Sequence, residues 1–142
     1  MDELSIRTAT PSEAGVVSEL LLEFNGEALS PDELAERMVQ AEGQEIVFLG
    51  ELEDRLAVLA VLRTVPTLSE PEDWAELTEL YVRPPARRRG VGKALVEAVI
   101  QYAQSRGCTQ VHLLVDPENG DALAFYTAVG FCRDSWEMRR QI

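Results

Sequence analysis

The sequence lacks several features that would assign it to a specialised class of protein. Its 142 residues contain two cysteines, Cys108 and Cys132, which are too few for a disulfide framework. No apolar run approaches the roughly 20 residues that cross a bilayer, and the first residues carry neither the basic nor the apolar stretch of a secretory signal. We therefore expect a reduced, cytoplasmic protein without a membrane partner.

A basic surface is also missing. The net charge is −12, whereas a duplex-binding protein needs a basic face, so nucleic acid is not an expected partner. The charge is unevenly distributed. Residues 1–79 hold 4 Lys and Arg against 19 Asp and Glu, and residues 80–142 hold 9 against 6. This asymmetry fits a basic segment that faces an anion and acids that face a cation, although a plain acidic surface would look the same.

Metal and nucleophile signatures are absent as well. No spacing of His, Cys, Asp and Glu matches a metal site, so no metal is expected. His112 is the only histidine and is expected to be packed or on the surface. The cysteines have no paired histidine signature and are interpreted as structural. Length and the lack of linkers predict one domain over residues 1–142.

Hydrophobic periodicity and turn residues predict a mixed α/β chain. Expected helices follow Ser12 as far as Asn25, follow Ser30 as far as Gly43, and cover Gly90–Arg106 and Ala122–Val129. Expected strands cover Ser5–Thr8, Ile46–Leu49, Leu56–Leu62, Trp74–Val82, Val111–Val115 and Phe131–Arg140, with Glu53 and Asp54 joining a hairpin. The helix between the strands at 74–82 and 111–115 predicts a parallel crossover, with a ligand crevice at the strands' carboxyl ends.

The segment that follows Trp74–Val82 has the composition of an anion site. Arg87, Arg88, Arg89 and Lys93 surround Gly90 and Gly92 where the long helix begins. A helix N-terminus offers unsatisfied N–H groups and partial positive charge, and glycine lets phosphate approach the backbone. The P-loop pattern does not match because Ala94 stands where it has Ser or Thr, and the dinucleotide fingerprint does not match because Leu95 stands in place of its third glycine, so both become minor alternatives.

Two motifs together resemble the GNAT superfamily of acyl-CoA-dependent N-acetyltransferases. Residues 87–92 (RRRGVG) resemble its pyrophosphate loop, and residues 119–131 (NGDALAFYTAVGF) resemble its second CoA-binding segment. The resemblance implies an α/β, GNAT-like fold in which a mixed, mostly antiparallel sheet has a central, splayed parallel strand pair and is flanked by helices. It also implies acetyl-CoA as acyl donor, a primary amine as acceptor, and direct transfer in a ternary complex.

The resemblance also implies roles for individual residues. The segment Leu80–Val82, with Tyr81 at its centre, would lie along the pantetheine arm, and the N–H of Leu80 would stabilise the thioester oxyanion. Tyr126 would hydrogen-bond the departing thiolate. The remaining cofactor-binding residues would be Arg87, Arg88, Arg89, Gly90, Val91, Gly92, Lys93 and Ala94 at the loop, and Asn119, Ala122 and Phe125 in the second segment. Leu114 stands where some relatives have a catalytic glutamate.

A general base is needed because an amine with a pKa near 10 is almost fully protonated at neutral pH. Glu76 and Glu79 are the candidates, and the sequence does not choose between them. Regular strand alternation predicts Glu76, Thr78, Leu80 and Val82 on one face, and Glu79 and Tyr81 on the other.

Other interpretations stay open at the level of sequence. The chain could be a non-catalytic module that binds or senses acyl-CoA, or an unrelated nucleotide binder. The loop at 65–73 contains Glu70, Glu72 and Asp73 and no basic residue, which favours a cationic acceptor, either a small molecule or a protein amine. An edge strand at the C-terminal end makes a homodimer possible.

Overall fold

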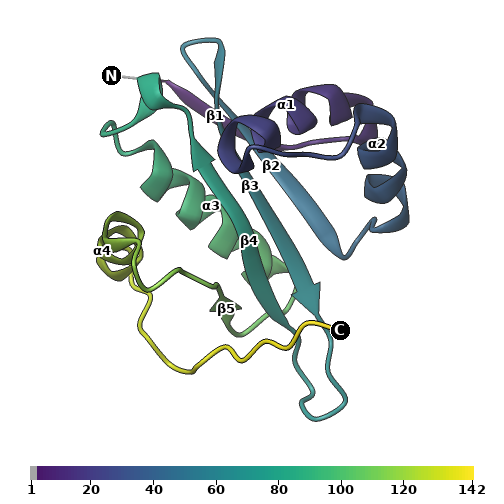
Figure 1. Cartoon of the computed structure of the whole chain (residues 1–142), viewed down its shortest axis with the longest axis vertical. Coiled ribbons are helices and arrows are strands. Elements are labelled where there is room, and N and C mark those ends of the chain that lie inside the picture. The colour runs from purple at the N-terminus through teal and green to yellow at the C-terminus, as the bar shows by residue number, and fades with distance from the viewer. Residues whose placement is uncertain (1–2) are drawn as a thin grey trace. The chain divides into compact units, whose positions relative to one another are not determined.

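The computed structural model describes residues 3–142 (Figure 1). The chain divides into two compact units at residue 112, so that one unit comprises residues 3–112 and the other residues 113–142. Within residues 3–142, none of the helices combines the length and the apolar character needed to cross a bilayer.

The first unit is built on a five-stranded sheet with the order β1-β2-β3-β4-β5. The strands are β1 Leu4–Thr8, β2 Glu45–Leu52, β3 Arg55–Val65, β4 Trp74–Val82 and β5 Val111–His112. All neighbouring pairs are antiparallel except β4 and β5, which are parallel. The predicted mixed α/β class is therefore confirmed. The parallel pair lies at the end of the strand order, because no strand is described after β5 in residues 113–142.

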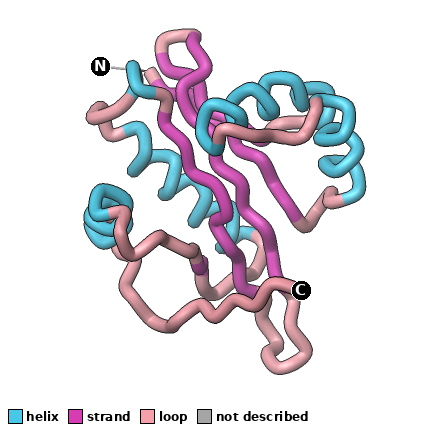
Figure 2. Tube along the Cα trace, viewed as in Figure 1, coloured by secondary structure: helices cyan, strands magenta, loops and turns pink. Residues whose placement is uncertain are grey.

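Helices cover both faces of this sheet, as the cyan and magenta segments of residues 3–112 show in Figure 2. On one face, α1 Ala14–Asn25 and α2 Pro31–Gln40 pack on the sheet. The buried core there consists of Val17, Leu20, Val47, Leu49, Leu59, Val61 and Tyr81. On the other face lies α3 Val91–Ser105, whose Leu95, Val96 and Val99 are almost fully buried. The two stripes follow the predicted helical periodicity.

The hairpin between β2 and β3 forms where the sequence predicts it. Glu53 and Asp54 have φ of 53° and 63°, as a two-residue hairpin turn with the twist of the strands requires. At Gly50 the β2–β3 register shifts, and a β-carbon there would overlap with Cγ2 of the buried Val58. Glycine is needed at this position because the neighbouring side chain occupies the space.

Two predicted strands are wrong in extent. The strand predicted over Val111–Val115 ends at His112, and Phe131–Arg140 contains no strand. β5 pairs with Ala75 and Glu76 of β4, and β4 has a bulge toward β3 at Thr78, two residues after the point where this short ladder ends. Residues 131–140 have alternating apolar positions but no ladder partner among the described residues, and alternation alone does not make a strand.

Candidate acyl-donor and amine site

The turn between β4 and α3 is shaped by two residues with left-handed backbone. A short 3-10 helix, Pro84–Ala86, follows β4, and then Arg88 has φ of 62° and Gly90, the N-cap of α3, has φ of 77°. A β-carbon on Gly90 would meet nothing within 4 Å. Gly90 is therefore suited to this position by its backbone freedom and not by a lack of space.

The first turn of α3 has N–H groups without backbone acceptors. The N–H of Ala94 donates to the carbonyl of Gly90 at 3.1 Å and is already used. Among the residues that the structure describes, no backbone oxygen accepts from the N–H groups of Val91, Gly92 or Lys93. Since the side chain of Val91 is buried in the core, only its backbone can serve a ligand. This arrangement suits an anion such as phosphate.

The four predicted cations of the turn fall into two pairs. Arg89 forms an ion pair with Glu53 at 2.6 Å. Arg87 donates from Nε to the carbonyl of Val82 at 2.9 Å, and its guanidinium lies 6.0 Å from the centre of the Tyr81 ring. By contrast, Arg88 and Lys93 make no ion pair with any residue in the range 3–142. Among the residues described, Arg88 and Lys93 are thus the cations of this turn whose side chains have no hydrogen bond, ion pair or ring contact, and in the sequence they lie close to the open N–H groups.

The predicted faces of β4 are wrong on one point. Glu79 pairs with Val61 of β3 and Leu77 pairs with Leu62, so Thr78 is an extra residue that forms a β-bulge. Its hydroxyl donates to the carbonyl of Val61 at 3.2 Å. Because the bulge interrupts alternation, Glu76 shares a face with Glu79 and not with Leu80.

Cross-strand partners identify that shared face. Glu79 pairs with Val61, whose side chain belongs to the core beneath α1, and Glu76 pairs with Arg63, two residues further along the same strand. Leu80 pairs instead with Ala60 on the α3 side. Both candidate bases therefore point to the α1 and α2 side of the sheet.

The two glutamates differ in their surroundings. Glu76 forms an ion pair with Nε of Arg63 at 3.0 Å. Glu79 is half-buried, and Nδ2 of Asn25 donates to its Oε2 at 3.4 Å. Burial raises the pKa of Glu79 above its ordinary value, and the Asn25 hydrogen bond offsets this rise only in part. Glu79 thus carries the property expected of a base that works near neutral pH.

Main-chain groups of Leu80 and Val82 face the open side of β4. The N–H of Arg83 donates to the carbonyl of Ala57 on β3 at 2.8 Å. In an antiparallel pair every second residue bonds the same neighbour, so Tyr81 also directs its main-chain groups toward β3. Leu80 and Val82 consequently direct their N–H and C=O groups away from β3. Within residues 3–112 no strand pairs with that side at these positions, because β5 stops at His112. Arg87 donates a hydrogen bond to the Val82 carbonyl, whereas no acceptor is described within residues 3–142 for the N–H of Leu80. The side chain of Tyr81 is core.

The second predicted segment lies in the other unit. α4 spans Gly120–Ala128, and Asn119 caps it by accepting from the N–H of Ala122 at 3.1 Å. Tyr126 lies between two aromatic rings, with centroid distances of 5.2 Å to Phe125 and 5.7 Å to Phe131. Gly130, with φ of 102°, ends the helix, and the N–H of Phe131 bonds the carbonyl of Tyr126 at 2.9 Å. The capping role of Asn119 was not predicted.

Cys108 is packed in the protein and His112 against a neighbouring ring, whereas Cys132 is exposed. Cys108 is buried, and this burial, with the charge of Asp73, raises the pKa of its thiol, which disfavours the nucleophilic thiolate. The ring of His112 stacks on Trp74 with centroids 4.3 Å apart, and its Nε2 lies 2.8 Å from Oε1 of Gln110.

Sequence reasoning missed Asn25, Arg63 and Arg83. Asn25 stands 54 residues before Glu79 and was interpreted only as the end of a helix. Arg63 and Arg83 bind carboxylates of other elements, Glu76 and Glu23. None of the three belongs to a local motif, so only the strand register and the packing of α1 could reveal them.

Comparison with known proteins gives consistent matches. A sequence model described as the acetyltransferase (GNAT) family matches residues 16–131. A putative acetyltransferase from Arthrobacter sp. FB24 has a crystal structure with a TM-score of 0.83 and 33% identity, covering 97% of this chain and 96% of that one.

Two curated relatives match part of the chain. An uncharacterized N-acetyltransferase of Methanocaldococcus jannaschii is 44% identical over 62 residues, covering 44% of this chain and 27% of that protein. The [ribosomal protein bS18]-alanine N-acetyltransferase of Salmonella typhimurium is 34% identical over 79 residues, covering 56% of this chain and 49% of that protein. The matched part thus spans from a quarter to a half of these two relatives.

Proposed function

Because the chain belongs to the GNAT family of acetyltransferases, we propose that it transfers an acetyl group from acetyl-CoA to a primary amine. The observation that carries the proposal is the start of α3, where three N–H groups, which have no backbone acceptor in residues 3–142, lie close in the sequence to the cations Arg88 and Lys93. A pyrophosphate needs such donors and cations together. The residues present therefore fit the donor that the family uses.

We assign donor binding unequally among the predicted residues. The N–H groups of Val91, Gly92 and Lys93 and the side chains of Arg88 and Lys93 bind the phosphates. Arg87 and Arg89 hold the turn in shape, since each is bound to another part of the protein, at Val82 and Glu53. The side chain of Tyr81 supports the turn from the core and does not touch the donor.

The reaction itself needs an oxyanion donor and a partner for the thiolate. The N–H of Leu80 serves as the oxyanion donor, because it faces the open side of β4. Tyr126 hydrogen-bonds the leaving sulfur. Tyrosine titrates near 10 and a simple thiol near 8.5, so full proton transfer would be uphill by roughly 2 kcal/mol with unperturbed groups. Tyr126→Phe is accordingly expected to lower kcat, and an unchanged kcat would remove Tyr126 from the mechanism.

Glu79 is the general base in this proposal. Its half-buried carboxylate and raised pKa favour it over Glu76, which Arg63 already binds. The neutral amine attacks the thioester carbon and the carbon–sulfur bond breaks. Glu79 accepts the proton that the amine loses. Glu79→Gln should remove the acidic limb of the pH profile of kcat/KM, whereas Glu76→Gln should leave that limb in place.

The acceptor in this proposal is either a small-molecule amine or an amine of a protein. The relative from Salmonella typhimurium is named for acting on an alanine of a ribosomal protein, which supports a protein amine. The acids Glu70, Glu72 and Asp73 in the loop after β3 favour a cationic molecule. An anionic best acceptor would contradict the charge argument.

Titration calorimetry with acetyl-CoA tests the donor site directly. The double variant Arg88→Gln/Lys93→Gln should weaken binding about tenfold or more, since each lost cation removes a charge-assisted contact with phosphate. The matched control Arg37→Gln/Arg106→Gln removes the same charge from α2 and from the far end of α3, and it should bind almost as the parent does. Equal affinity of the two double variants would contradict the assignment.

Turnover and competition then separate the transferase from the two alternative functions. Release of free thiol in the presence of an amine establishes the transferase. Binding of acetyl-CoA without turnover of any amine would instead support the non-catalytic, acyl-CoA-sensing alternative. Binding of ATP in competition with acetyl-CoA would favour a general nucleotide binder.

A further inference from the structure

The C-terminal half of α1 follows β4 in the opposite direction, with three contacts in register. Glu23 binds Arg83, with Oε2 2.6 Å from Nη2. Phe24 stacks on Tyr81, with ring centroids 5.1 Å apart and planes 22° apart. Asn25, the last residue of α1, reaches Glu79. Successive helix residues thus contact every second residue of the strand.

From this arrangement we propose that Asn25 is a positioning residue that orients the carboxylate of Glu79 toward the amine. This inference rests on the proposed function, in which Glu79 is the base. The amide Nδ2 of Asn25 donates to Oε2, and within residues 3–142 no other hydrogen bond or ion pair is described for this carboxylate. Holding Oε2 leaves Oε1 to accept the proton of the substrate.

The geometry allows Asn25 to hold this orientation. Gly26, with φ of 80°, follows Asn25 and donates to the carbonyl of Leu22 at 2.9 Å, which ends α1 at a defined residue. The backbone therefore fixes the position of Asn25 at the C-terminal end of α1. The donor–acceptor distance of 3.4 Å is long, as catalytic hydrogen bonds often are before substrate binds, and it can shorten in the complex.

The contact is not needed to hold α1 in place. Arg83 also lies 3.6 Å from Glu19 and donates to the carbonyl of Leu56 at 3.3 Å, so one guanidinium joins α1, β3 and β4. The buried Val17 and Leu20 fix the same helix to the sheet. Asn25 itself is exposed, so loss of its amide should leave the helix where it is.

Neighbouring charges do not obscure the effect of Asn25. On β4 the nearest carboxylate, Glu76, is neutralised by Arg63 of β3. Arg83 is neutralised by Glu23 and Glu19 of α1. Opposite Glu79, β3 places the apolar Val61. Burial and the Asn25 hydrogen bond are thus the influences on Glu79, and of these only Asn25 favours the charged carboxylate.

The test is the pH dependence of kcat/KM with acetyl-CoA and the best amine found by thiol release. Asn25→Ala removes a hydrogen bond that stabilises the carboxylate, so the acidic limb should move to higher pH, and kcat should fall about five- to thirtyfold. Asn25→Asp should move the limb further, because a second carboxylate disfavours ionisation of the first. The KM for acetyl-CoA should stay unchanged in both variants.

Glu23→Gln is the matched control. It weakens the neighbouring tie between α1 and β4 and should lower the melting temperature without moving the acidic limb. In addition, Asn25→Ala should have no further effect on kcat in a Glu79→Gln background, because a positioning residue acts only through the group it positions.

Two failures would be distinguishable. If Glu79→Gln removes the acidic limb while Asn25→Ala neither moves that limb nor lowers kcat, the positioning role is wrong and the proposed base stands. A shift of the limb by Glu23→Gln equal to that by Asn25→Ala would likewise overturn the role of Asn25. If Glu79→Gln is as active as the parent at every pH, the proposed base is wrong and the role of Asn25 with it.

Discussion

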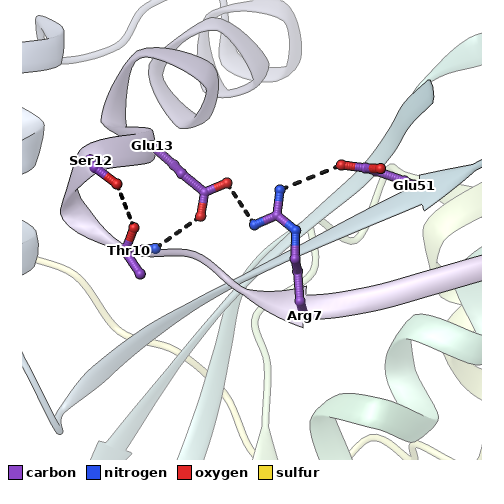
Figure 3. Close-up of polar contacts among 5 residues, drawn as sticks. All are labelled: Arg7, Thr10, Ser12, Glu13 and Glu51. Atoms are coloured by element: carbon purple, nitrogen blue, oxygen red, sulfur yellow. Dashed lines mark hydrogen bonds and ion pairs between the residues drawn. The ribbon is translucent and has the colours of Figure 1, made fainter. Parts of the chain in front are cut away.

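At the scale of single residues, Glu13 shows how one side chain can serve two elements (Figure 3). Its Oε1 accepts from the N–H of Thr10 at 3.2 Å in a capping box, and its Oε2 lies 2.6 Å from Nη1 of Arg7 on β1. Arg7 also reaches Glu51 of β2, at 3.5 Å. Burial alone would raise the pKa of Glu13, but Arg7 and the N–H of Thr10 outweigh it, and the pKa is lowered.

A glutamate with a lowered folded-state pKa contributes stability above its unfolded-state pKa and loses it as pH falls through the folded-state pKa. Glu13→Gln should therefore cost about 0.5–1 kcal/mol at neutral pH, because it removes a half-exposed ion pair and weakens a cap. Below about pH 4 the difference from the parent should shrink. Thermal unfolding from pH 7 to pH 3 measures this, with Glu42→Gln, whose carboxylate makes no described ion pair, as control.

Gly50 is a residue whose missing side chain matters. Gly50→Ala should destabilise by about 1–3 kcal/mol, because the new β-carbon would overlap with Val58, a fully buried and rotationally stiff side chain. Gly15→Ala in α1 is the matched control. A β-carbon there would meet no side chain of a non-adjacent residue within 4 Å, and alanine favours helix, so this variant should be more stable by roughly 0.5–1 kcal/mol. Denaturant unfolding of both variants checks the opposite signs.

At the scale of elements, the sequence allowed prediction wherever a local signal decides the structure. The stripe of α3 and the turn at Glu53 and Asp54 are local, and both were predicted correctly. No local sequence pattern indicates the bulge at Thr78. A bulge exists only where one strand has an extra residue relative to its partner, so it depends on β3 as well as on β4. The predicted faces of Glu76 and Leu80 failed for that reason. The prediction of a strand at 131–140 was wrong because an alternating pattern does not show whether a neighbouring strand is available for pairing.

The start of α3 tests whether a backbone conformation contributes to donor binding. Gly90→Ala should cost about 1–2 kcal/mol, the strain of a left-handed backbone with a β-carbon. It should also weaken acetyl-CoA binding, because relaxing that strain turns the N–H groups of Val91 and Gly92. Gly107→Ala at the other end of α3 carries the same strain, with φ of 85°, and should cost stability alone. Calorimetric titration beside thermal unfolding separates the two effects; weaker binding in both variants would contradict the idea.

At the scale of the whole molecule, the site predicted from sequence is divided between two units. The loop at 87–94 and the segment at 80–82 belong to residues 3–112, whereas Asn119, Ala122, Phe125 and Tyr126 belong to residues 113–142. Motif spacing could predict both groups because each is contiguous in the sequence. Asn25 and Glu53, which contact Glu79 and Arg89, lie outside these segments, so only the fold reveals those two contacts.

The charge of the whole molecule predicts a dependence on salt. An acidic protein that binds a polyanion through the side chains of Arg88 and Lys93 should lose affinity as salt screens these charges, since the screening length at 0.15 M is about 8 Å. The dissociation constant for acetyl-CoA should rise severalfold between about 0.05 and 0.5 M sodium chloride. Arg88→Gln/Lys93→Gln should flatten this dependence. A steep dependence retained in the double variant would place the phosphate-binding charge elsewhere.

The bulge at Thr78 adds one residue to β4 while the residues on either side of it keep their partners on β3. Thr78 is exposed and offers one hydroxyl contact, so replacing its side chain should be tolerated. Deleting the residue would join Leu77 directly to Glu79, so Leu77 would still pair with Leu62 and Glu76 with Arg63. The deletion would remove the local bend and extra twist that a bulge gives a strand. In a mutational scan this position should therefore accept most substitutions, and the loss of its codon should leave Leu77 in the core.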